Sequence, residues 1–265
     1  GDFGWRQVRR ISHTADDATP VDVREFAHDR NQNKIVRALT TPFVPNGFTN
    51  RQEFTYDSLN RLARSSTSTN GAPVLDTSYT LDPMGNRQPV VHNDTTGNYQ
   101  MDNTWPDPAD YQVHQYTITP YDTRRYDENG NLRQTLIGDQ LDPGLTFVYD
   151  YADRLVEVQG TNGPAAVYAY DALGRRVAKV VYADLSPALT NRYLYADGQV
   201  IEEENGDGTL ARTHVLPHVF DQRERITITG DGEVLYHLCD DQGNLIALAD
   251  KNGHVVERFD YDDFG

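Results

Sequence analysis

Carboxylates are the chemically reactive groups in which this sequence is richest. Its 265 residues include 40 Asp and Glu against 24 Lys and Arg, so the formal net charge is −16. Close pairs such as Asp240-Asp241 are unavoidable at this density and do not by themselves indicate acid–base catalysis. The sequence contains no Ser-His-Asp signature, no phosphate-binding Gly-rich loop and no paired Cys/His spacing typical of zinc. We therefore expect no catalytic residue, no cofactor and no resident metal, and hence no enzyme.

One stretch comes close to a calcium loop without completing it. Asp29, Asn31 and Asn33 have the spacing that opens an EF-hand loop. Lys34 then stands at the required Gly, and Thr40 at the bidentate Glu. The EF-hand interpretation fails, although weak surface binding of calcium stays open for so acidic a chain.

The histidines and the cysteine also give no site. His214 and His218 are four residues apart, but Pro217 excludes the helix that would align them. Cys239 is the only cysteine, so there is no internal disulfide, and its position beside His237 indicates packing. Proteins bind phosphate backbones and anionic membranes through Lys and Arg. The negative charge therefore predicts that the chain does not bind nucleic acid and does not insert into a membrane.

A short phrase recurs along the chain and defines the elements that carry these side chains. It reads aromatic, one residue, Tyr-Asp, two residues, Gly, Asn or Arg, and then an aliphatic residue. A phrase repeated every roughly 20–45 residues is typical of an array of supersecondary units. The residues that we assign to this structural repeat motif are Tyr56, Asp57, Asp82, Gly85, Tyr126, Asp127, Gly130, Tyr149, Asp150, Tyr170, Asp171, Gly174, Tyr195, Tyr236, Asp240, Gly243, Tyr261, Asp262 and Gly265.

Each copy of the phrase predicts a β-hairpin. Alternating aromatics before the Asp indicate a strand. The Asp opens a turn by accepting hydrogen bonds from nearby backbone N–H groups, and the Gly takes the left-handed position that precedes a bulge. Asn60 and Asp153 replace this Gly and are side chains that tolerate positive φ. Gln32, three residues after Asp29, breaks the rule.

Composition and turn spacing predict one continuous β-domain over residues 1–265. Hydrophobic residues make up 37 % of the chain, which is low for a compact domain and favours a thin sheet that is wet on much of both faces. Residues 88–121 depart from the repeat, and Trp105-Pro106-Asp107-Pro108 indicates a Pro-containing loop insertion there. The abrupt start at Gly1-Asp2-Phe3-Gly4 indicates an excerpt of a longer polypeptide.

Three stretches carry a resemblance to a known family. Val113-His114-Gln115-Tyr116 with the hairpin at residues 126–132 is similar to an Asn-Gln-Tyr segment, with His114 in place of the Asn. Residues 192–203 form the second stretch. Residues 236–265 are similar to a core-end motif in which Asp263 stands where Pro is usual. On these residues the chain resembles the Rhs/YD-repeat family, which includes polymorphic toxins, toxin-complex shell proteins and teneurin-like proteins.

The resemblance implies an all-β fold of tandem hairpins in a twisted, spirally wound strip, a section of a hollow shell near the C-terminal part of the Rhs core. It implies a secreted or cell-surface bacterial protein, non-catalytic itself, that encloses or displays a C-terminal toxin domain. The implied partners are the remainder of its own shell and that enclosed domain.

The family's self-cleavage phrase, Asp-Pro-x-Gly-Leu, has two near matches here. Asp142-Pro143-Gly144-Leu145 is one residue short, and Asp82-Pro83-Met84-Gly85-Asn86 has Asn in place of Leu. Both read as turns, so we expect no protease activity.

An alternative is an extracellular adhesion or filament-forming module. An open strip leaves strand edges that can pair with another chain. Asp2-Phe3-Gly4 also echoes Asp263-Phe264-Gly265, as if units continued head to tail. A carbohydrate-active enzyme is a third class, but the sequence lacks a convergent carboxylate motif for it.

Overall fold

The computed structural model describes residues 7–15, 18–41, 48–101, 115–137, 144–215 and 226–264. All regular elements in these ranges are β-strands, and they include no helix that could span a membrane. The strands are β1 (Arg10–Thr14), β2 (Pro20–His28), β3 (Lys34–Thr41), β4 (Phe48–Tyr56), β5 (Leu62–Thr69), β6 (Ala72–Leu81), β7 (Arg87–His92), β8 (Thr95–Asn98), β9 (Thr123–Tyr126), β10 (Leu132–Leu136), β11 (Thr146–Tyr149), β12 (Leu155–Gly160), β13 (Gly163–Tyr170), β14 (Arg176–Ala183), β15 (Ser186–Ala196), β16 (Gln199–Asn205), β17 (Leu210–Val215), β18 (Ile226–Thr229), β19 (Val234–Cys239), β20 (Leu245–Ala249) and β21 (Val255–Arg258).

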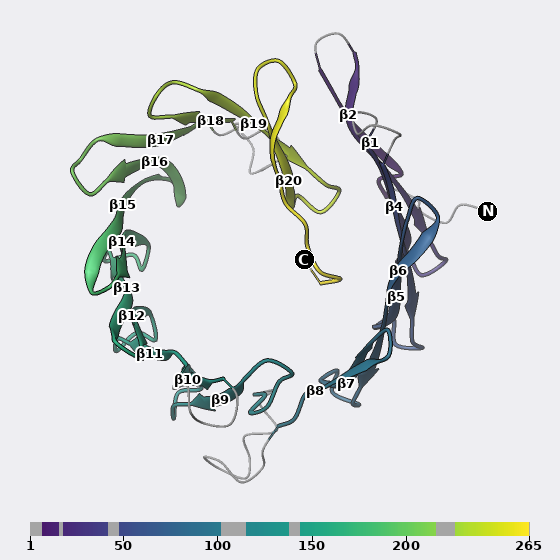
Figure 1. The fold of residues 1–265 in the computed structure, drawn as a ribbon, viewed down its shortest axis with the longest axis horizontal. Helices are drawn as coiled ribbons and strands as arrows, with labels where there is room; N and C mark the ends of the chain where they lie inside the picture. Colours follow the sequence, from purple (N-terminus) through teal and green to yellow (C-terminus); the bar gives the residue numbers. More distant parts are fainter. Residues whose placement is uncertain are drawn as a thin grey trace. The chain divides into compact units, whose positions relative to one another are not determined.

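The chain divides into two compact units. The first unit comprises Gly1–Thr96 and Val215–Gly265, and the second comprises Gly97–His214. In the first unit, β1 to β7 lie side by side in chain order, and so do β18 to β21. In the second unit, β9 to β17 do the same (Figure 1). Since neighbouring strands are antiparallel wherever the structure describes their register, the all-β hairpin fold expected from the repeat is confirmed.

The turns have the geometry that the Asp-x-x-Gly phrase predicts. In the turn that begins at Asp127, the Asp127 N–H donates to the Asn131 carbonyl (2.9 Å) and the Gly130 N–H donates back to the Asp127 carbonyl (3.0 Å). Gly130 has φ +87°. A bulge follows, because Leu132 pairs with Tyr126 and the register shifts before Gln134. This is a type I turn with a bulge at the left-handed residue.

The copy that breaks the sequence rule forms the same turn. Gln32 has φ +69°, and its N–H donates to the Asp29 carbonyl at 3.1 Å. Asn60 and Asp153, which also replace Gly, have φ +60° and +56°. Each of these three turns keeps the hydrogen bonds to its opening Asp, so the turn forms without Gly at the left-handed position.

Apolar burial is concentrated in the first unit. The central residues of β20, Ile246 and Ala247, are 1 % and 0 % exposed, and on β2 Val21 is 3 % exposed. In the second unit the buried apolar residues among those described are Val158 and Ala166, both 8 % exposed. The second unit is thus a thin sheet, as the low hydrophobic content predicts, whereas the first unit has a small core.

Part of the segment predicted as a loop is a hairpin. Residues 88–92 lie in β7 and residues 95–98 form β8, with Val90 only 2 % exposed. Farther on, Ile118 makes isolated bridges to Gln100 and Thr123. The two β-branched residues Val90 and Val91 favour a strand, but we did not use this signal because the segment departs from the repeat phrase. Trp105 to Pro108 lie outside the described residues.

Candidate functional site

Eight turns of the described chain share one hydrogen-bond pattern centred on an Asp carboxylate. In the turn at Asp171, Oδ1 accepts from the backbone N–H groups of Leu173 and Arg175, both at 2.9 Å, and Oδ2 accepts from Arg175 Nε at 2.7 Å. We call these the Asp turns. They begin at Asp29, Asp57, Asp82, Asp127, Asp150, Asp171, Asp240 and Asp250.

The hydrogen bonds of the Asp turns stabilise the ionised form of several of these carboxyls. The N–H groups of Arg61 and Arg175 lower the pKa values of Asp57 and Asp171, and the Arg154 side chain lowers the pKa of Asp150. Asp57, Asp150 and Asp171 are ionised at neutral pH and act as acceptors only. Among the described residues, no group of three or more His, Cys, Asp or Glu side chains could hold a metal ion. The chemistry of the Asp turns is that of structural anchors.

Tyrosine hydroxyls connect one hairpin to the next. In successive hairpins, Tyr149 donates to the Leu132 carbonyl (3.0 Å), Tyr170 to Leu155 (2.7 Å) and Tyr195 to Arg176 (2.8 Å). Each acceptor lies five residues after the Asp of the preceding turn, beside the bulge that interrupts the regular ladder. In the first unit Tyr56 donates to Lys34 and Tyr261 to Leu245, both at 2.7 Å. We call this series the Tyr ladder.

Asn side chains bind to the next turn where the residue three positions after its Asp is not Gly. Asn31 and Asn33 both donate Nδ2 to Asn60 Oδ1, each at 2.9 Å. In the second unit, Asn129 and Asn131 donate in the same way to Asp153 Oδ1, at 3.0 and 2.8 Å. Asn60 and Asp153 are therefore acceptors for the preceding turn as well as tolerant of positive φ. The sequence signal that we missed is a pair of Asn residues one repeat upstream.

Where the next turn does contain Gly, an Arg side chain makes the contact to that turn. Arg61 Nη1 donates to the Asp82 carbonyl at 2.7 Å, and Arg154 Nη1 to the Asp171 carbonyl at 3.3 Å. The Arg154 guanidinium also lies 5.1 Å from the ring centre of Tyr170. One side chain thus closes its own turn, contacts the following turn and stacks on the ladder Tyr.

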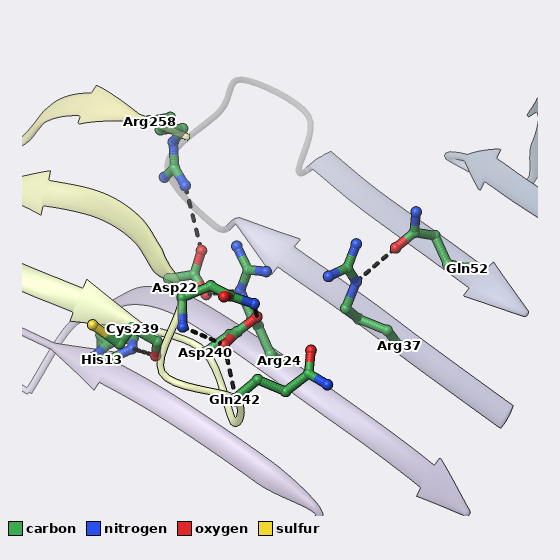
Figure 2. Close-up of polar contacts among 10 residues, drawn as sticks. His13, Asp22, Arg24, Arg37, Gln52, Cys239, Asp240, Gln242 and Arg258 are labelled. Carbon is green, nitrogen blue, oxygen red and sulfur yellow. Dashed lines mark hydrogen bonds and ion pairs between the residues drawn. The ribbon is translucent and has the colours of Figure 1, made fainter. Parts of the chain in front are cut away.

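A second polar cluster lies in the first unit and joins residues more than 200 positions apart (Figure 2). Asp22, which is completely buried, accepts from Arg24 Nε at 3.0 Å and from Arg258 Nη1 at 3.3 Å. Lys34 pairs with Asp241 at 2.7 Å. Burial and the charge of Arg24 lower the pKa of Arg37, which donates to Gln52. Sequence reasoning missed Asp22, whose signal was a charge between Val21 and Val23.

The remaining predicted motif residues lie in less regular places. Tyr126 donates to the Tyr116 carbonyl (3.0 Å), and Tyr236 is 41 % exposed on β19. Asp262 Oδ1 accepts from the Phe264 N–H. Gly85, Gly174 and Gly243 have φ values of +92°, +79° and +87°, as the repeat requires.

The structure describes one of the two near matches to the cleavage phrase in full and the other only in part. Asp82 to Asn86 form an Asp turn, as we predicted. Asp142 and Pro143 lie outside the described residues, as do His114 and Gly265.

A chain of antiparallel hairpins joined by Asp turns and a Tyr ladder defines a tandem β-hairpin repeat protein. The model of the teneurin YD-shell family matches residues 22–265. The chain belongs to this family, and the resemblance to Rhs/YD-repeat proteins is confirmed. Membership of a shell family supports a structural role.

The curated relatives that the chain matches are much longer proteins. The tRNA3(Ser)-specific nuclease WapA of Bacillus spizizenii is 26 % identical over 191 residues, which cover 71 % of this chain and 7 % of that protein. The tRNA nuclease WapA of Bacillus subtilis gives the same identity and coverage. This chain therefore spans only a small fraction of the length of these relatives.

Two solved structures resemble the chain at low identity. A structure of the Photorhabdus luminescens Tc holotoxin pore is 13 % identical with a TM-score of 0.34, and covers 95 % of this chain and 17 % of that one. The TcdB2-TccC3 crystal structure is 15 % identical with a TM-score of 0.33, at 97 % and 18 % coverage. The family assignment rests on the family match.

Proposed function

We propose that this chain is a section of the wall of a β-shell and that the shell encloses or displays a C-terminal toxin domain of the same polypeptide. The observation that carries the proposal is the use of the repeat side chains. Asp carboxylates close the turns, and Tyr, Asn and Arg side chains connect each turn to the next. The polar groups of these side chains hold neighbouring hairpins of the sheet together.

Containment follows from the sheet itself. Strands in a hydrogen-bonded ladder are about 4.7–4.9 Å apart, too close for a polypeptide to pass between them. A thin sheet with polar surface on both faces suits a wall with solvent on one side and a polar cargo on the other. The chain needs no catalytic group for this role, and we assign it none.

The relatives guide the proposal for partners and location. WapA proteins are named as tRNA nucleases, and this chain matches about 7 % of their length. We assign no nuclease activity to this chain, and we propose that its partners are the rest of its shell and an enclosed toxin domain elsewhere in the polypeptide. The corresponding location is secreted or on the bacterial cell surface.

Electron microscopy of the native full-length protein, with an intact mass on the same sample, tests the proposal. We expect closed hollow particles with a mass far above that of this chain, and an enclosed domain that resists added protease until the particle is opened. A domain that is digested as quickly as a free polypeptide would rule out containment. Long fibres with this chain as the repeating subunit would instead establish the adhesion or filament alternative.

A further inference from the structure

The last described residues, 259–264, form no strand, yet they are fixed to the first unit at several points. The Phe259 N–H donates to the Ile246 carbonyl at 3.0 Å, and the Tyr261 hydroxyl donates to the Leu245 carbonyl at 2.7 Å. Beyond Tyr261 the segment contacts β5, β6 and β7 instead of β20. Among the described residues Tyr261 is the last member of the Tyr ladder, and a different set of contacts follows it.

Asp263 is held by two hydroxyl donors. Ser65 Oγ donates to Asp263 Oδ1 at 2.8 Å, and Tyr79 OH donates to Asp263 Oδ2 at 2.6 Å. Ser65 is 3 % exposed, and it lies 198 positions before Asp263 in the sequence. Burial, followed by the hydrogen bond to Asp263, raises the pKa of Tyr79, so this hydroxyl keeps its proton and remains a donor.

Phe264 is held beside Asp263 by a ring and a cation. Its ring meets the Tyr79 ring edge-on, with 5.2 Å between centroids and 83° between planes. The Arg87 guanidinium lies 4.1 Å from the centre of the Phe264 ring. The sheet thus presents two hydroxyls for a carboxylate and a cation with a ring edge for a phenyl group. Their spacing fits adjacent Asp and Phe residues.

We propose that Ser65, Tyr79 and Arg87 form a receptor site for an Asp-Phe pair and that residues 259–264 are a latch that occupies it. The latch anchors the end of the described chain to β5–β7, so that any following residues begin their course at that sheet. Hydrogen bonds to an ionised acceptor are the stronger kind, so Asp263 is the principal contact. Phe264, 51 % exposed, is the lesser one. A Pro at position 263, as the family resemblance leads one to expect, offers no side-chain acceptor and could not make this latch.

Hydrogen exchange of the full chain, read by mass spectrometry, tests the latch. In Asp263→Ala we expect exchange in the peptide covering residues 255–264 to accelerate by about tenfold or more, because two hydrogen bonds to a charged group are lost. Ser65→Ala and Tyr79→Phe each remove one of these bonds and should give smaller accelerations. The matched control is Tyr170→Phe, which removes a tyrosine hydroxyl bond in the second unit and should leave this peptide unchanged.

A peptide added in trans tests whether the site recognises the Asp-Phe pair. Calorimetry should show saturable binding of a synthetic peptide of residues 259–264 to the Asp263→Ala chain, whose own latch no longer competes. The peptide with Ala in place of Asp263 should not bind, nor should the natural peptide bind to the Asp263→Ala, Tyr79→Phe double variant. If Ser65→Ala and Tyr79→Phe leave exchange unchanged, or the natural peptide fails to bind, the latch is wrong. These two single variants decide the matter should Asp263→Ala unfold the chain.

Discussion

The two units use the same hairpin in different ways. In the second unit, the described contacts between hairpins connect each one to its neighbour in chain order, through Tyr149, Tyr170 and Tyr195. The first unit contains the same Asp turns but also joins residues about 200 positions apart, such as Asp22 with Arg258 and Tyr79 with Asp263. The repeated contacts connect each hairpin to the next one along the chain. The contacts between distant segments are made by residues that do not belong to the repeated pattern.

This difference predicts how the stability of each unit responds to the loss of a single side chain. Where each hairpin contacts only its neighbours, stability is approximately a sum of local terms, and a defect stays local. Where distant segments meet at a buried ion pair, such as that between Asp22 and Arg24, the loss of one partner leaves the other charge buried without it. The first unit should therefore unfold as one body and the second in segments.

Removal of the buried Asp22 carboxylate should give the largest effect. Asp22→Ala leaves Arg24 and Arg258 without their acceptor, so we expect the first unit to lose about 3–5 kcal/mol of stability. Denaturant unfolding, resolved by hydrogen exchange in each unit, measures this loss. The control is Glu53→Ala, which breaks an ion pair with Arg51 whose side chains are 50 % and 55 % exposed and should cost less than about 1 kcal/mol. Equal losses in the two variants would show that the cluster does not hold the first unit together.

Gly130→Val should have the next largest effect, confined to the hairpins around β9 and β10. Gly130 has φ +87°, and a β-branched residue held there costs about 1–3 kcal/mol. Gly130→Asn is the control and should cost much less, because Asn tolerates this region and already occupies the equivalent position at Asn60. Local hydrogen exchange together with the melting temperature measures both variants. An unchanged melting temperature in Gly130→Val would refute the turn assignment.

Loss of one hydroxyl from the Tyr ladder should cost about 1 kcal/mol. In Tyr149→Phe and Tyr170→Phe the ring stays, but the bonds to the Leu132 and Leu155 carbonyls are lost. Exchange should accelerate in the hairpins on either side of the substituted residue and not in the first unit. Tyr151→Phe is the control, because Tyr151 is 96 % exposed. If Tyr151→Phe were as damaging as the two ladder variants, the ladder would not contribute to stability.

The sequence predicted the local structure well because the repeat is a local code. The turn at Asp127 could be predicted from the spacing of Asp127 and Gly130, and the turn at Asp29 has the same hydrogen bonds although Gln32 replaces the Gly. The sequence did not predict which residues meet across the first unit. Nothing in the local pattern around Asp22 or Asp263 indicates Arg258 or Tyr79, since those contacts depend on how distant strands are brought together.

The smallest predicted effect is a difference in how the two units respond to mild acid, caused by His28. This residue is 6 % exposed, and its Nδ1 has no hydrogen-bond partner among the described residues. Burial lowers its pKa, as does Lys34, while Asp241 and Asp29 act in the opposite direction. Because the pKa of His28 is lower in the folded state, the unfolded chain binds protons more readily than the folded chain does. The stability of the first unit is therefore fully present above the ordinary His pKa of about 6.5 and falls as the pH drops below it.

The pH dependence should therefore separate the units. In the first unit, hydrogen exchange corrected for intrinsic rates should accelerate between about pH 6.5 and pH 5. The stability of the second unit should stay unchanged down to about pH 4. Below that pH, carboxylates such as Asp150 and Asp171, whose folded-state pKa values are lowered, become protonated and no longer stabilise the fold. His28→Phe is the control: it should abolish the response of the first unit above pH 5 and leave the acid response of the second unchanged. A first unit that responds identically with and without His28 would place its acid sensitivity in the carboxylates, and the two units would then differ in connectivity alone.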